Sequence, residues 1–110
     1  MKNKFKNAFN GLGYALKDKS ILLQCFLGLL AIIGGLIIKL DYYEWLSFII
    51  CIGLVISLEI VNTSIERVCN LFTDKYDEHV KIIKDMSSAF VLVAAIMSLI
   101  VCLLVIIRRI

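Results

Sequence analysis

The sequence predicts an all-α membrane protein, in which an N-terminal amphipathic surface helix precedes three transmembrane helices. Of the 110 residues, 61% are hydrophobic and 19% are charged, and the mean hydropathy is +0.93. Soluble domains average about 45–50% apolar and about 25% charged residues, so this balance does not suit a surface in water. It excludes disorder as well, because disordered chains have low hydrophobicity. Three spans of roughly 20 residues would use more than half of the chain, so a single membrane domain over residues 1–110 is expected.

The first expected element is a surface helix over residues 1–20. Phe5, Phe9, Leu12 and Leu16 recur there at helical spacing, with lysines and asparagines between them. This pattern is typical of a helix that lies in the plane of the membrane interface with its apolar face in the lipid.

Three apolar segments predict the transmembrane helices, at residues 21–38, 45–65 and 86–107. The first and the third contain no Asp, Glu, Lys or Arg, and Glu59 is the one charged residue of the second. Polar and aromatic residues at 39–45 separate the first two segments, as is common where a chain leaves the bilayer.

The distribution of basic residues predicts the orientation. Nine Lys and Arg residues lie in the N-terminal segment and the polar 66–85 loop, whereas the loop on the other side has Lys39 alone. Cytoplasmic loops are enriched in Lys and Arg, so we expect a multi-pass cell-membrane protein with its N-terminus and its 66–85 loop in the cytoplasm. Arg108 and Arg109 oppose this rule, but the loop asymmetry outweighs them. The net charge of +3 follows from this topology, and no nucleic-acid partner is expected.

Glu59 lies inside the second predicted span, where a carboxylate costs on the order of 2.5–3.5 kcal/mol. Asn62 and Glu66 follow at i+3 and i+7, which places the three side chains within roughly 60° on one helix face. Such a stripe can bind a divalent cation through oxygen ligands, or Glu59 can serve as a general base. The structural alternative is that Asn62 bonds between helices and Glu66 is solvated at the helix end.

Lys84 and Asp85 directly precede the third predicted span. Without further context they favour a structural interpretation, in which Asp85 caps the helix and Lys84 extends to the lipid headgroups. The functional alternative is that Lys84 binds a polyphosphate while Asp85 adds to a metal site. The sequence contains no G-x-x-x-x-G-K-[ST] motif, so a bound nucleotide would not be held by a Walker loop.

The segment EIVNTSIE at residues 59–66, followed by KD at 84–85, resembles the small bacterial membrane kinases of the diacylglycerol kinase and undecaprenol kinase family. That family carries E-x-x-N-[ST]-[AS]-I-E in its second span and K-D before its third. The spacing between the two motifs fits without insertion or deletion, and the resemblance covers nearly the whole chain. It favours the functional interpretation of Lys84 and Asp85.

The resemblance implies an ATP- and Mg²⁺-dependent lipid kinase that forms a homotrimer, with composite sites between protomers at the cytoplasmic interface. Glu59 resembles the catalytic base, which takes the proton from the lipid hydroxyl. Glu66 and Asp18 are implied as the magnesium ligands. Cofactor binding as a whole is implied for Asn62, Glu66, Lys84, Asp85 and Asp18. An oligomer also makes physical sense, because three helices alone cannot enclose both ATP and a lipid.

Several positions depart from the family pattern. Asp18 stands where glutamate is usual, and Leu22 and Gln24 fall where the family often has an arginine and another polar or charged group. Asn70 replaces an aspartate, and Phe90 occupies a position that is usually small, near the start of the third span. The core of the motif is intact, so activity is expected, with a reduced or altered rate as the alternative.

Within the family, we expect undecaprenol as the substrate and undecaprenyl phosphate as the product. The Asn62-Thr63 pair and the Glu44-Trp45-Leu46 entry to the second span resemble the Gram-positive branch. Met86 and Ser88 resemble diacylglycerol kinases instead, so the alternative reaction converts diacylglycerol to phosphatidic acid. More remote alternatives are a small proton-coupled transporter that uses Glu59 and a structural membrane peptide.

Overall fold

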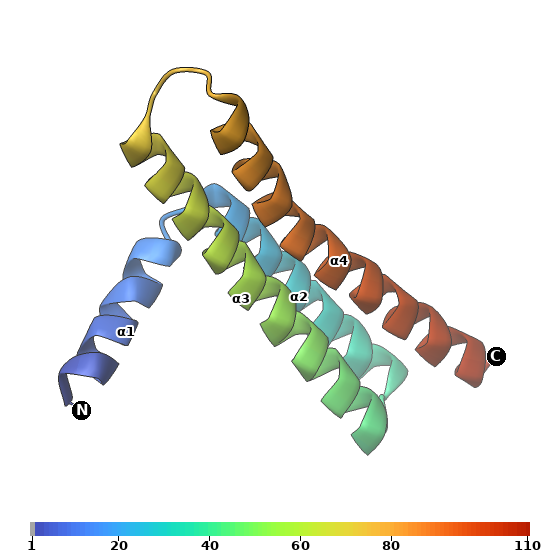
Figure 1. Ribbon diagram of the computed structural model, residues 1–110. Helices are drawn as coiled ribbons and strands as arrows, with labels where there is room; N and C mark the ends of the chain where they lie inside the picture. Colours follow the sequence, from blue (N-terminus) through green and yellow to red (C-terminus); the bar gives the residue numbers. More distant parts are fainter. Residues whose placement is uncertain (1) are drawn as a thin grey trace.

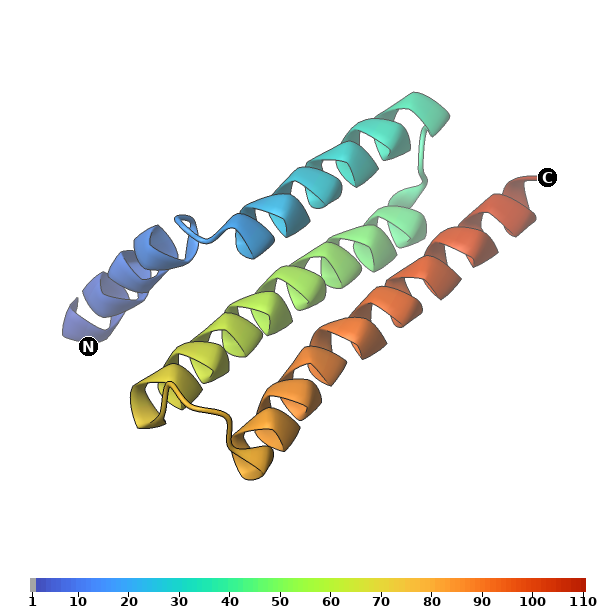
Figure 2. The same ribbon diagram turned by 90° about the horizontal axis from the view of Figure 1, so that it is seen from above.

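Four α-helices form the part of the chain that the computed structural model describes, residues 2–110 (Figure 1). They are α1 (Lys2–Ala15), α2 (Lys19–Ile38), α3 (Tyr42–Phe72) and α4 (Glu78–Arg109). The helices α2, α3 and α4 lie side by side, and α1 diverges from them, as Figures 1 and 2 show from two directions. Each of the three long helices is long and apolar enough to cross a membrane. The predicted all-α class and the three spans are confirmed.

The helix ends differ from the predicted ones. The surface helix was expected to reach residue 20, but α1 ends at Ala15 and a turn leads to α2. The polar 66–85 loop is largely helical, since α3 continues to Phe72 and only residues 73–77 connect it to α4. Hydropathy marks where a helix leaves the lipid, and a polar helix can continue beyond that point in water.

Two aspartates cap helices at the end of the bundle where α2 and α4 begin. Asp77 Oδ1 accepts bonds from the backbone N–H groups of His79 at 2.9 Å and Val80 at 3.1 Å, so α4 begins there. The expectation that Asp85 caps the third span is therefore wrong, because Asp85 lies two turns inside α4. Asp18 caps α2 in the same way, through bonds from Ser20 at 2.9 Å and Ile21 at 3.4 Å. These caps satisfy N–H groups that a helix start leaves without partners.

Helix α3 packs against both of its neighbours, most extensively against α4. Gly28 marks a close approach of α2 to α3, because a Cβ built there would lie 2.8 Å from Ile52 Cγ2 on α3. On α4, Ala94 is only 1% exposed. Small residues permit this close packing of helices in membranes, where lipid tails compete with apolar side chains for contacts.

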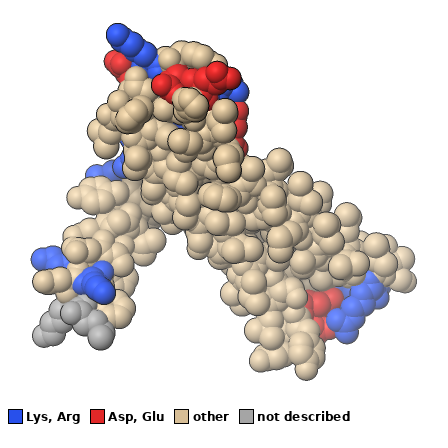
Figure 3. Space-filling model, viewed as in Figure 1, with Lys and Arg blue, Asp and Glu red and all other residues tan. Residues whose placement is uncertain are grey.

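Arg109, at the end of α4, holds the α2–α3 turn at the other end of the bundle. Its guanidinium donates to the backbone carbonyls of Ile38 and Lys39, both at 2.9 Å, and forms an ion pair with the buried Glu44 carboxylate. Arg108 pairs with Asp41 at 3.1 Å. The two arginines that oppose the predicted orientation are thus each paired with a carboxylate. Figure 3 shows these charges grouped at one end of the long helices.

Replacing Arg109 by alanine is expected to lower the thermal unfolding temperature clearly, because it leaves the Glu44 carboxylate and two backbone carbonyls without their donor. Arg108→Ala is the matched control, since the Arg108–Asp41 pair is exposed, and exposed ion pairs contribute little. Thermal unfolding of both variants in detergent gives the comparison. An equal shift for the two variants would contradict the role given to Arg109.

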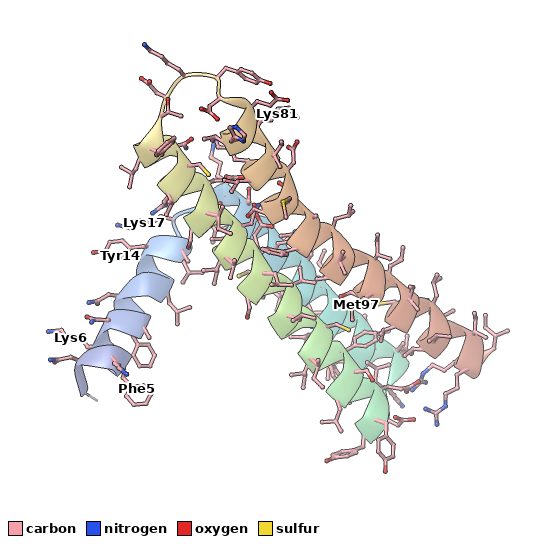
Figure 4. The ribbon with its side chains drawn as sticks, viewed as in Figure 1. Phe5, Lys6, Tyr14, Lys17, Lys81 and Met97 are labelled. Atoms are coloured by element: carbon pink, nitrogen blue, oxygen red, sulfur yellow. The ribbon has the colours of Figure 1, made fainter. Side chains whose placement is uncertain are left out.

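Phe5 and Lys6 project from different sides of α1. In Figure 4, Phe5 projects from the side of α1 that faces the long helices, whereas Lys6 and Tyr14 project from the opposite side. Phe5 and Phe9 are 63% and 70% exposed, so the described residues leave most of both side chains uncovered.

Candidate functional site

The predicted stripe on α3 runs from the interior of the bundle to its exposed end. Glu59 and Asn62 are buried, at 7% and 8% exposure, whereas Glu66 is exposed. A carboxylate and an amide thus lie inside an apolar bundle, close to the end where α2 begins and α3 leaves the membrane-spanning part.

Asn62 is joined to α4 by a buried hydrogen bond. Ser87 Oγ donates to Asn62 Oδ1 at 2.7 Å, and Ser87 is 2% exposed. The structural alternative for Asn62, a bond between helices, is therefore present. The bond uses only the carbonyl oxygen of Asn62, and the NH₂ group of the same side chain lies within reach of the Glu59 carboxylate, which can accept one of its two donors.

Ser87 was not predicted as a site residue from the sequence. It is one of two adjacent serines, and sequence alone does not indicate which of them faces α3. The helical periodicity of α4 gives a retrospective signal, since Ser87 and the buried Ala94 are seven residues apart on the same helix face.

Lys84 reaches from α4 to α3. Its ammonium group donates to Asn70 Oδ1 at 2.8 Å, and Asn70 follows Glu66 by one helical turn. This bond holds the positive charge of Lys84 near the exposed end of the α3 face that carries Glu59, Asn62 and Glu66. Asn70, one of the departures from the family pattern, accepts this bond as a neutral side chain, so it holds Lys84 without offsetting its positive charge.

Asp85 lies on the exposed surface of α4. It forms an ion pair with Lys81 at 2.7 Å, and both side chains are more than half exposed. Among residues 2–110, the structure gives Asp85 no polar contact with α3. Within the described chain, Asp85 therefore has no contact with the α3 stripe, whereas Lys84 bonds to Asn70 beyond the end of that stripe.

The negative charges of Asp18 and Glu66 both act on the Glu59 carboxyl group, which places the three acids in one electrostatic environment. Both backbone bonds to Asp18 use Oδ1, so the cap does not engage Oδ2. The described residues contain no group of three His, Cys, Asp or Glu side chains arranged to hold a metal ion. Mg²⁺ is commonly held by one or two carboxylates together with substrate phosphates, and the donor set of Asp18 and Glu66 fits that requirement.

Two other departures lie on the outside of the helices. Leu22 is 47% exposed and Phe90 is 46% exposed. The large Phe90 side chain thus projects outward from α4, so its bulk is accommodated without crowding the helices of the same chain.

Three apolar helices with a buried acid and amide, and with a lysine that bridges α4 and α3 near the same end, define a multi-pass membrane protein with a polar site at the membrane edge. Figure 3 shows the charged side chains gathered at the ends of the long helices, with an apolar surface between them.

The comparison with known families agrees with this class. The model of the prokaryotic diacylglycerol kinase family matches residues 6–106, and the chain belongs to that family. It is also similar to the undecaprenol kinase of Bacillus subtilis (strain 168), with 38% identity over 74 residues. The aligned part covers 67% of this chain and 60% of that relative, so less than two thirds of the relative is spanned.

Proposed function

We propose that this protein transfers a phosphoryl group from ATP to the hydroxyl group of undecaprenol, and that the reaction takes place at the Glu59 end of the bundle. The main support is the burial of Glu59 at 7% exposure, in an apolar helix bundle and beside a buried amide. A carboxylate is rare in such a place unless it serves a function. Family membership and the name of the Bacillus relative point to the same class of reaction.

Glu59 acts in this proposal as the general base that takes the proton from the lipid hydroxyl. Its position inside the membrane-spanning part suits a substrate that arrives from the lipid, while ATP arrives from the water side. Asn62, held by Ser87 and next to Glu59, binds and orients polar groups with the NH₂ donor that Glu59 leaves available. Lys84 stabilises the negative charge of the phosphates, because phosphoryl transfer depends mainly on positioning and charge neutralisation.

Glu66 and Asp18 are the residues that would hold Mg²⁺, each with a carboxylate oxygen available at the water side of Glu59. The ion supplies neutralisation of the phosphate charge when it is bound. Glu66 is exposed on α3 and Asp18 is half-buried at the start of α2, so both remain accessible to a nucleotide from solution.

The assembly that we propose is a homotrimer with sites shared between protomers, and with α1 on the cytoplasmic membrane surface. The exposed Asp85 supports shared sites, because it is displaced from Glu59 within one chain and available to a second copy. The exposed phenylalanines of α1 support a position in the interface, with Lys6 turned the other way (Figure 4).

The choice of lipid is tested by offering undecaprenol and diacylglycerol in parallel detergent micelles, with labelled ATP and magnesium. We expect a higher kcat/KM for undecaprenol, because the Asn62-Thr63 and Glu44-Trp45-Leu46 segments resemble that branch of the family. A preference for diacylglycerol would contradict the assignment of the lipid and leave the phosphoryl transfer intact. The family description makes diacylglycerol the second candidate.

A further inference from the structure

Ser87 uses its hydroxyl group differently from three other serines of the long helices. Ser47, Ser64 and Ser98 each donate to the backbone carbonyl four residues earlier in the same helix, at 3.0, 2.9 and 2.8 Å. Such a bond within one helix is common for serine. Ser87 instead donates to Asn62 Oδ1 on α3, at 2.7 Å. Its hydroxyl is therefore committed to a contact between two helices.

The bond between Ser87 and Asn62 is shielded from water and lipid, because both side chains are buried. It is the one bond that the described residues give to Asn62 Oδ1. A buried amide oxygen that loses its donor also loses the compensation for its desolvation. The Ser87 hydroxyl is thus the group that keeps this oxygen turned toward α4.

The same bond selects one of the two orientations of the Asn62 amide group. An amide presents an accepting oxygen on one side and a donating NH₂ group on the other. With Oδ1 turned to Ser87, the NH₂ group lies within hydrogen-bonding reach of Glu59, one turn earlier on α3. The reverse orientation would place Oδ1 against the Glu59 carboxylate, which only accepts hydrogen bonds when it is ionised.

Ser87, Asn62 and Glu59 therefore connect α4 to the proposed base through buried polar groups. Lys84 lies one helical turn before Ser87 and also bonds to α3, through Asn70. One stretch of α4 thus carries both the proposed phosphate contact and the hydroxyl that orients Asn62.

We infer that Ser87 is a positioning residue of the proposed reaction: its hydroxyl holds the Asn62 amide so that an NH₂ donor faces Glu59 and fixes the direction of the carboxylate. The inference rests on the proposed function, because it takes Glu59 as the base. When one carboxylate oxygen accepts from Asn62, the other is left in a defined direction for the lipid hydroxyl. General-base catalysis depends on such geometry, and a small misplacement lowers the rate.

The alternative is a purely structural role, because polar side chains commonly form hydrogen bonds between helices in membranes. Under that alternative, loss of the Ser87 hydroxyl weakens the contact between α3 and α4 without a specific effect on the chemical step. The two roles therefore differ in kcat and in the response of the Asn62 NH₂ group to a change at Glu59.

Ser87→Ala is expected to lower kcat for lipid phosphorylation by about tenfold to a hundredfold, with KM for ATP and for the lipid nearly unchanged. Ser87→Thr keeps a hydroxyl group and is expected to recover most of this kcat. The matched control is Ser98→Ala, which removes a hydroxyl that bonds to the Ala94 carbonyl of its own helix. Initial rates over ranges of both substrates give kcat and KM. Full kcat in Ser87→Ala, equal losses in Ser98→Ala, or folded Ser87→Thr as slow as Ser87→Ala would overturn the inference.

The side-chain amide signals of asparagine test the same contacts without turnover. The sample is the full-length protein in micelles with ¹⁵N-labelled asparagine, and Asn62→Ala assigns the Asn62 NH₂ signals. We expect these signals to shift in both Ser87→Ala and Glu59→Gln, because a bond to an ionised carboxylate is stronger than a bond to a neutral amide. Ser98→Ala is expected to leave them in place. A shift in neither variant, or in Ser87→Ala alone, would overturn the inference.

This inference and the proposed function fail in different ways. Unmodified, folded protein that phosphorylates no lipid would contradict the kinase, whatever the Asn62 signals show. Phosphorylation by the unmodified protein with an unchanged kcat in Ser87→Ala would leave the kinase intact and contradict the role of Ser87.

Discussion

Replacing Glu59 by glutamine is expected to lower kcat for lipid phosphorylation by roughly 10²–10⁴-fold, the usual contribution of a general base. Glutamine has nearly the same shape and can keep the packing of this buried side chain, but it cannot accept the proton from the lipid hydroxyl. We expect KM for ATP to change little, because Glu59 is buried on the lipid side of the proposed nucleotide contacts. Initial rates with labelled ATP over a range of lipid and ATP concentrations separate the two parameters.

The matched control is Glu78→Gln, which makes the same chemical change at an exposed site in the first turn of α4. We expect it to retain activity close to that of the unmodified protein. If Glu59→Gln keeps its activity while remaining folded, Glu59 is not the base. Loss of activity in both variants would point to a general effect of charge rather than to the position of Glu59.

Replacing Lys84 by methionine is expected to lower kcat/KM for ATP by roughly 10²–10³-fold, similar to the loss of one donor that stabilises charge in a transition state. Methionine keeps the length of the side chain and removes the ammonium group that now donates to Asn70. The effect on the lipid KM is expected to be small, because Lys84 precedes the apolar span of α4 and bonds to Asn70 on the water side of Glu59. Steady-state kinetics with ATP as the varied substrate measure the loss.

Lys75→Met serves as the control for Lys84→Met, since Lys75 is an exposed lysine in the connection between α3 and α4. The Lys75→Met variant lowers the net charge by the same amount as Lys84→Met and leaves the bond between Lys84 and Asn70 unchanged. Equal losses in the two variants would mean that the whole basic surface attracts ATP. A loss confined to Lys84→Met supports a specific contact with the phosphates.

The spans and the α3 stripe could be predicted from sequence because both depend on short-range patterns. Long apolar segments and the high cost of an intramembrane carboxylate identify α2, α3, α4 and Glu59 without knowledge of neighbours. Helical periodicity then places Asn62 and Glu66 on the same face. The structure adds that this face turns from buried at Glu59 to exposed at Glu66.

The contacts between helices could not be predicted in the same way. The bonds from Ser87 to Asn62 and from Lys84 to Asn70 depend on the register of α4 against α3, which no local pattern records. The start of α4 was misplaced because Asp77 and Asp85 both precede residues that can form a helix, and the charged residues between them interrupt the apolar segment by which the span was identified. In the structure Asp77 caps the helix, and Asp85 is left on its surface.

The most direct test of the central claim is the mass of the lipid product formed by the purified protein from undecaprenol, ATP and magnesium. The account predicts a lipid that is heavier by one phosphate, formed together with one ADP and absent when Glu59→Gln replaces the unmodified protein. Folded protein that yields no phosphorylated lipid from undecaprenol or diacylglycerol, or that releases ADP without such a product, would contradict the account.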